Sequence, residues 1–93
     1  MLTTLLLTQN SWRFDFMDVN NLLEYAINES KLIVKDEIFL VKDLFKGYEW
    51  NRIPRKDRLL LGTLFLNHIN KLNGTIVPIE KTSSGQQKYK KLR

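Results

Sequence analysis

Cysteine is absent from the 93-residue chain, and histidine occurs once, as His68. Without cysteine the chain cannot form a disulfide framework, a cysteine zinc finger or a thiol nucleophile. The single histidine has no carboxylate at a useful spacing, so the sequence offers no nucleophile-and-base set and we expect no enzymatic activity. A phosphate-cradling glycine loop and a metal-ligand spacing are missing as well, and we expect no cofactor and no small-molecule substrate.

Long apolar runs are also missing. No stretch approaches the roughly 20 apolar residues that span a bilayer. The apolar start, residues 1–10, lacks the basic segment and the cleavage site of a signal peptide. We therefore expect no membrane contact and a cytoplasmic location. With 43% hydrophobic residues, the chain is large enough for one domain with a single modest core.

Acidic residues are scarce in the second half of the chain. Residues 51–93 contain ten Lys and Arg against Asp57 and Glu80, a net charge of +8. Residues 1–50 contain five basic and eight acidic residues, a net charge of −3, which leaves +5 overall. Positive charge concentrated in one part of a small domain is typical of a surface that binds a polyanion.

Two interpretations of residues 1–16 are open. Met17 directly precedes Asp18, a good helix N-cap, so a natural start at Met17 would make residues 1–16 a dispensable extension of a domain at 17–93. Alternatively, Leu2–Leu7 is an added strand, and three aromatic residues pack on the domain, namely Trp12, Phe14 and Phe16. Deleting residues 1–16 separates the two, because a large drop in melting temperature contradicts the first.

Hydrophobic periodicity predicts a first helix over residues 18–31. After a polar turn, Ile38–Val41 is short, β-branched and aromatic, and it predicts a strand. Lys42–Lys46 predicts one or two helical turns, which Gly47 closes as a C-cap. Residues 48–53 are expected to form a loop.

A long helix is predicted from Pro54, a residue favoured in the first turn, to about Leu72. At 100° per residue, its apolar side holds Leu61, Leu64, Phe65, His68 and Leu72, flanked by Leu60 and Ile69.

A C-terminal hairpin follows the long helix. Residues 75–79 and 86–92 predict two strands around a Ser- and Gly-containing turn, and Pro78 indicates an edge position or a bulge. Tyr89 is expected to cover the core. Helix, short strand, short helix, long helix and hairpin wing is the element order of an α+β winged helix-turn-helix domain.

The basic half supplies a predicted nucleic-acid surface. The outer face of the long helix carries cations and small hydrogen-bonding groups without an acid, which suits base edges and phosphates. The hairpin adds hydroxyls and lysines for phosphate oxygens. The predicted contact residues are Arg52, Arg55, Lys56, Thr63, Asn67, Asn70, Lys81, Ser83, Ser84, Lys88, Lys90 and Lys91.

Structural interpretations compete with these functional ones, because amphipathic helices need a solvated face and Lys-rich termini are common. Arg58 lies toward the buried side and is expected to snorkel or to pair with an acid such as Glu49 or Asp43. Trp50 is expected to fill the core, and His68 to be a core or boundary residue. Gly62 costs the helix about 1 kcal/mol relative to alanine. Tight packing or a nearby DNA backbone would account for it.

Three segments share a pattern with a known family. Phe39–Trp50, Arg58–Phe65 and Gln87–Tyr89 contain a Leu-Phe-x-Gly turn, a Trp, Arg-x-x-x-Gly-x-x-Phe and a terminal Tyr. This pattern, over about residues 36–92, resembles an uncharacterised family of small proteins from low-GC Gram-positive bacteria and their phages and mobile elements, classed as a domain of unknown function. The resemblance implies a compact winged-helix-like domain, and no activity or binding residues.

The leading hypothesis is a small transcriptional regulator of bacterial or phage origin that binds double-stranded DNA with sequence preference. A homodimer on a two-fold site, formed through the first helix or the N-terminal segment, fits the small number of bases that one domain can read. The alternative is a non-catalytic protein-binding module, such as a phage-encoded inhibitor of a host nucleic-acid-binding protein, because fold does not fix function. RNA binding is a third possibility.

Overall fold

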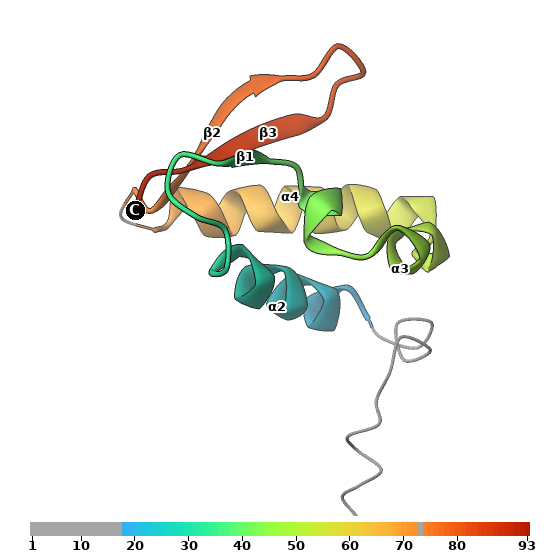
Figure 1. Ribbon diagram of the computed structural model, residues 1–93. Helices are drawn as coiled ribbons and strands as arrows, with labels where there is room; N and C mark the ends of the chain where they lie inside the picture. Colours follow the sequence, from blue (N-terminus) through green and yellow to red (C-terminus); the bar gives the residue numbers. More distant parts are fainter. Residues whose placement is uncertain (1–17, 73) are drawn as a thin grey trace, which may run out of the picture.

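The computed structural model describes residues 18–72 and 74–93. The interpretations of residues 1–16 lie outside the described residues. Along the chain the elements are α2 (Val19–Ser30), β1 (Ile38–Phe39), the 3-10 helix η2 (Val41–Leu44), α3 (Gly47–Arg52), α4 (Arg55–Asn70), β2 (Ile76–Lys81) and β3 (Gln87–Lys91) (Figure 1). The strands form an antiparallel sheet in the order β1-β3-β2.

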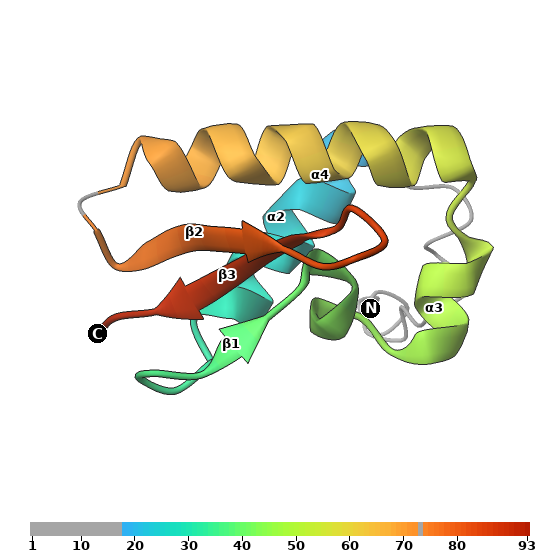
Figure 2. The same cartoon turned by 90° about the horizontal axis from the view of Figure 1, so that it is seen from above.

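The helices α2 and α4 cover one face of the sheet, and the β2–β3 hairpin extends beyond it (Figure 1). Seen from above, α4 runs alongside β2 (Figure 2). The segments η2 and α3 connect β1 to the N-terminal end of α4. This α+β arrangement confirms the predicted fold class, and its element order is compatible with a small winged-helix domain.

The core forms where α2, α4 and the sheet meet. The ring of Tyr89 is buried and lies 5.7 Å from that of Phe39 and 5.1 Å from that of Phe65, between ring centroids. Burial of such aromatic side chains removes a large apolar area from water. The expectation that Tyr89 covers the core is therefore confirmed.

Local chemistry explains several element boundaries. The Asp18 carboxylate accepts the backbone N–H of Asn21 at 3.0 Å, which caps α2 as expected. Pro78 lies in the edge strand β2, and the pairing register with β3 shifts between Pro78 and Lys81. Both outcomes foreseen for this proline, an edge strand and a bulge, are present.

The segment around Gly47 differs from the prediction. Gly47 is the first residue of α3 rather than a helix C-cap, and its φ is not positive. The Glu49 carboxylate accepts the N–H of Lys46 at 3.2 Å, and the rings of Phe45 and Trp50 pack 5.6 Å apart. These contacts turn the predicted loop 48–53 into a helix. The predicted strand likewise ends at Phe39, because the chain enters η2 at Val41.

The buried stripe of α4 is narrower than predicted. Leu61, Phe65 and Ile69, spaced four residues apart, face the core. Leu60 and Leu72 were placed on or beside the apolar side, but both are exposed. The contacts of α4 with α2 and with β2 explain this shift, because they select one stripe from a helix that is leucine-rich on several sides.

Candidate nucleic-acid interface

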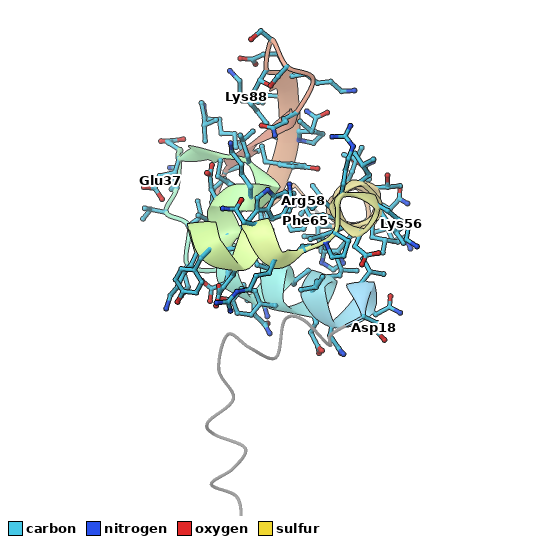
Figure 3. All side chains as sticks on the ribbon, turned by 90° about the vertical axis from the view of Figure 1, so that its right-hand side faces the viewer. Asp18, Glu37, Lys56, Arg58, Phe65 and Lys88 are labelled. Atoms are coloured by element: carbon cyan, nitrogen blue, oxygen red, sulfur yellow. The ribbon has the colours of Figure 1, made fainter. Side chains whose placement is uncertain are left out.

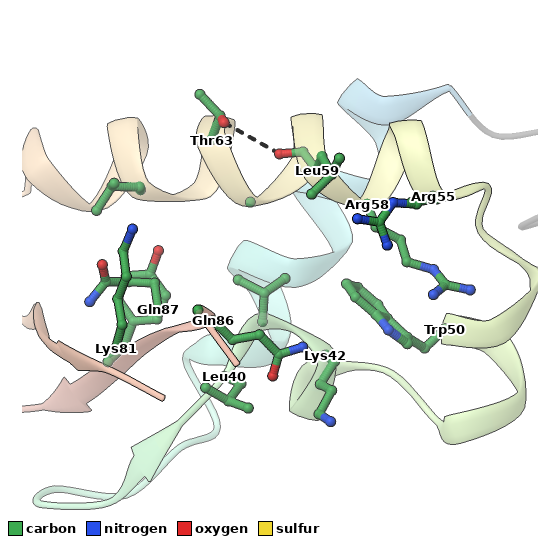
Figure 4. Close-up of a pocket in the computed structure, with 15 residues that line it drawn as sticks. Leu40, Lys42, Trp50, Arg55, Arg58, Leu59, Thr63, Lys81, Gln86 and Gln87 are labelled. Atoms are coloured by element: carbon green, nitrogen blue, oxygen red, sulfur yellow. Dashed lines mark hydrogen bonds between the residues drawn. The ribbon is translucent and has the colours of Figure 1, made fainter. Parts of the chain in front are cut away.

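A groove of about 450 Å³ separates the wing-facing side of α4 from the hairpin. One wall comes from α4, through Arg55, Gly62 and Thr63 (Figure 4). The facing wall comes from the hairpin, including Lys81. The end nearest α3 is closed by the indole of Trp50. The groove therefore joins parts of the chain that lie far apart in the sequence.

The groove has a positive electrostatic character. No Asp or Glu belongs to the described residues that line it. Arg55 and Lys81 are both exposed, and neither makes an ion pair with any residue of 18–72 or 74–93. In Figure 4 the Lys81 side chain rises from the hairpin toward α4. Two unneutralised cations thus flank one opening, which favours an anion there.

The outer face of α4 continues from this groove. Lys56, Asn67 and Asn70 are exposed there, as predicted. In Figure 3 Lys56 lies on the side of α4 that faces away from the body of the domain. The Thr63 hydroxyl bonds to the Leu59 carbonyl at 3.3 Å and stays on the surface. Amide, hydroxyl and ammonium groups of this kind match base edges and phosphate oxygens.

The hairpin tip is an ordered turn. The Thr82 hydroxyl accepts the N–H of Gln86 at 3.0 Å and lies 3.1 Å from the Ser84 hydroxyl. Gly85 adopts a φ of +90°, which a residue without Cβ reaches at little cost. Ser83 and Ser84 are exposed at this tip, so their hydroxyls are presented to the surroundings as predicted.

Three predicted contact residues are placed elsewhere. Lys91 is buried, and its ammonium group donates to the backbone carbonyls of Ser30 at 3.0 Å and Ile33 at 2.9 Å. It is not available to a phosphate. Lys88 and Lys90 alternate with buried Tyr89 along β3, so they occupy the sheet face that points away from α4. Figure 3 shows Lys88 on the hairpin, on the side away from α4, and Lys56 on the outer side of α4.

Lys88 is also partly neutralised. Its ammonium nitrogen lies 3.0 Å from a carboxylate oxygen of Glu80. This hydrogen bond, together with the nearby charge, lowers the pKa of Glu80 below its usual value. The basic hairpin thus contributes fewer cations to the α4 side than its composition suggests.

The arginines before and within α4 have different surroundings. Arg58 donates from Nε to the Ile53 carbonyl at 2.8 Å, and its guanidinium lies 5.5 Å from the centroid of the Trp50 ring. It is a structural residue as expected, although it binds carbonyls and an indole rather than an acid. Arg52, predicted as a contact, lies at the end of α3 with its guanidinium 5.2 Å from the Tyr48 ring.

The groove is also lined by Gln86 and Gln87 from the hairpin and by Lys42 from η2, and nothing in the sequence indicated Lys42. The side-chain amide of Gln87 donates to the Ile79 carbonyl, while Gln86 is exposed. Lys42 belongs to the acidic half of the chain, so charge distribution gave no signal for it. Only the turn into η2 brings it near the groove.

The described residues contain no helix long and apolar enough to cross a membrane. They also contain no group of three or more His, Cys, Asp or Glu side chains arranged to hold a metal ion. A family model, described as a Domain of unknown function (DUF1413), matches residues 24–91. The chain belongs to this family. No curated protein and no solved structure matches the chain.

Membership of this domain family confirms that the pattern in the sequence belongs to an uncharacterised domain of unknown function, and the match begins earlier than residue 36. In the structure, most residues that carried the resemblance are core or packing residues. Phe45, Phe65 and Tyr89 are buried, and Trp50 packs against Arg58. The two glycines differ from these residues, because Gly47 is exposed and Gly62 lies in the wall of the groove. The family description itself brings no activity to this chain.

Proposed function

We propose that this protein binds double-stranded DNA as a small transcriptional regulator of bacterial or phage origin. The outer face of α4 enters a groove of the duplex, and the hairpin tip follows the adjacent backbone. The observation that supports this most is the pair Arg55 and Lys81, two unpaired cations on neighbouring elements beside an exposed face of amides and hydroxyls. The homodimer stays a prediction, with α2 or the N-terminal segment as its expected surface.

The residues proposed to contact DNA divide by role. Arg55, Lys56 and Lys81 bind phosphates, because they are exposed and carry no ion pair within the described chain. Asn67 and Asn70 lie on the outer face of α4 and supply base-edge contacts. Ser83 and Ser84 at the hairpin tip bind phosphate oxygens. Lys88, Lys90 and Lys91 are removed from the set by their positions.

The test is fluorescence anisotropy with a labelled random 20-base-pair duplex over a salt series. Three phosphate-binding cations predict that log K falls against log salt with a slope of about −3. Lys56→Glu combined with Asn67→Ala should abolish binding at moderate salt. Single strands and RNA of the same length are measured in parallel, and tighter binding to either would contradict the duplex assignment.

A matched control comes from the opposite face of the domain. Lys88→Glu makes the same charge change as Lys56→Glu but lies on the sheet face that points away from α4. This variant should reduce the affinity for duplex DNA far less than Lys56→Glu, because it weakens only the overall positive potential of the protein and removes no direct contact. Equal losses for the two variants would show that binding follows net charge and not the proposed surface.

One observation favours a second candidate, the protein-binding module. Leu59 and Leu60 are 61% and 45% exposed on α4, and exposed leucines side by side are more typical of a protein contact than of a DNA contact. Under this candidate, Lys56→Glu leaves duplex affinity unchanged within error. Substituting both leucines with serine then abolishes a host-protein interaction, and Lys88→Glu does not.

A further inference from the structure

Gly62 lies in the middle of α4, and nothing among residues 18–72 and 74–93 gives a steric reason for it. A Cβ built on Gly62 meets no atom within 4 Å, so the tight packing considered for this residue is wrong. Its φ is not in the left-handed region, and alanine would gain the helix about 1 kcal/mol. The space beside Gly62 belongs to the groove between α4 and the hairpin. Glycine at this position leaves the α4 wall of the groove without a side chain.

The groove offers two kinds of surface. Part of the groove is apolar, because its lining includes Trp50, Leu40 and Leu66 as well as Gly62. Its opening carries the unpaired cations Arg55 and Lys81, and no carboxylate is present among the described lining residues. A volume of about 450 Å³ lies in the range of small-molecule sites. Bare phosphate would use the cations and leave the apolar wall in water.

We infer that this groove is a binding site for a small amphipathic anion, with a flat apolar body and one acidic group. The apolar body lies over Gly62 and against the indole of Trp50. The acidic group, a carboxylate or sulfonate, binds the guanidinium of Arg55, at the end of the groove that Trp50 lines. The guanidinium of Arg58 packs on the indole and holds it in place. Arg58 is itself fixed by the hydrogen bond that its Nε donates to the Ile53 carbonyl. The inference does not rest on the proposed DNA binding.

Naphthalene-2-carboxylate is a suitable probe, because it combines a flat apolar body with one carboxylate. Its binding to the full chain is followed by ¹H–¹⁵N chemical shifts without nucleic acid. We expect saturable shifts that centre on Gly62, Gly85 and Gln86. Naphthalene-2-methanol, its neutral counterpart, should bind at least about tenfold more weakly, since the lost charge contact is worth about 1.4 kcal/mol or more.

Two variants locate the site. Gly62→Leu places a side chain in the groove and should abolish naphthalene-2-carboxylate binding. Gly47→Leu is the matched control: a Cβ there also meets nothing within 4 Å, and Gly47 does not line the groove. It should leave binding unchanged. Arg55→Gln changes an exposed residue that is not part of the core, and it should weaken binding about tenfold even if Gly62→Leu does not fold.

Three results would overturn the inference. The first is an affinity for naphthalene-2-methanol equal to that for the carboxylate, because the cations would then play no part. The second is a set of shifts that Arg55→Gln and Gly62→Leu leave unchanged. The third is competition by inorganic phosphate at the same concentration, which would assign the groove to a bare phosphate group and leave the apolar wall without a ligand.

Discussion

The ammonium group of Lys91 donates to the backbone carbonyl of Ser30 at 3.0 Å, across 61 positions of sequence. Ser30 is the last residue of α2, and Lys91 also reaches the carbonyls of Lys31 and Ile33. A cation at the C-terminal end of a helix matches the negative end of the helix dipole and satisfies carbonyls that have no partner in the helix. Lys91 thus fixes α2 to the central strand of the sheet.

Replacing Lys91 with methionine should therefore destabilise the fold rather than weaken ligand binding. The variant keeps the apolar stem but removes the ammonium donor from the part-buried Ile33 carbonyl and leaves the Ser30 carbonyl with the N–H of Ile33 alone, which costs about 1–3 kcal/mol. Urea unfolding followed by circular dichroism measures this loss. Lys88→Met serves as the control, because the Lys88–Glu80 pair lies at the surface, where solvent screens it and it contributes little to stability. Similar losses for both variants would argue against this role of Lys91.

Arg55 and Arg58 lie one helical turn apart and should respond in opposite ways to the same change. Arg58→Gln removes the contact with Trp50 and the bond to the Ile53 carbonyl, so the melting temperature should fall by several degrees. Arg55→Gln should leave the melting temperature unchanged and lower the affinity for duplex DNA, because Arg55 is exposed and unpaired within the described chain. Calorimetry and anisotropy together distinguish the two.

A loss of DNA affinity in Arg58→Gln at a temperature where the variant is fully folded would place Arg58 at the interface. Conversely, a destabilised Arg55→Gln would show that Arg55 has a structural partner. Either result would require a different division of the basic residues.

The sequence predicted the order of the elements other than α3 because these have strong local signals. Apolar spacing marks α2, Pro54 marks the start of α4, and a Ser- and Gly-containing turn marks the hairpin. The α3 segment was missed because its helix depends on contacts that a periodicity analysis does not include. These contacts are the Glu49 carboxylate on the Lys46 N–H and the Phe45–Trp50 packing.

The candidate site was predictable only where position on a helix decides exposure. Lys56, Asn67 and Asn70 were placed on the outer face of α4, where they lie. Charge density alone misplaced the lysines of β3, because strand alternation sends Lys88 and Lys90 away from α4 and buries Lys91. Lys42 lies beside the groove only because of the tertiary fold. Its position in the acidic half of the chain gave no indication of this.

Gly62→Ala should raise the stability of the fold. The methyl group meets no atom within 4 Å, and the helix gains up to about 1 kcal/mol from the better propensity of alanine. Gly85→Ala is the opposite control, because φ is +90° there and any Cβ is strained. Urea midpoints should thus move in opposite directions. A destabilised Gly62→Ala would show that α4 requires the glycine for a reason inside the fold.

Tyr89 should make the fold sensitive to alkaline pH. Burial raises its pKa from 10.0 to about 12, so between these values the unfolded chain releases the phenolic proton and the folded chain keeps it. Stability is fully present below pH 10 and falls as the pH rises toward 12. In Tyr89→Phe this fall should be smaller, although not absent, because burial also raises the pKa of Tyr25.

Urea midpoints at pH 8, 10 and 11 measure the difference between the wild type and Tyr89→Phe. If the profile of Tyr89→Phe runs parallel to that of the wild type, another group governs alkaline unfolding.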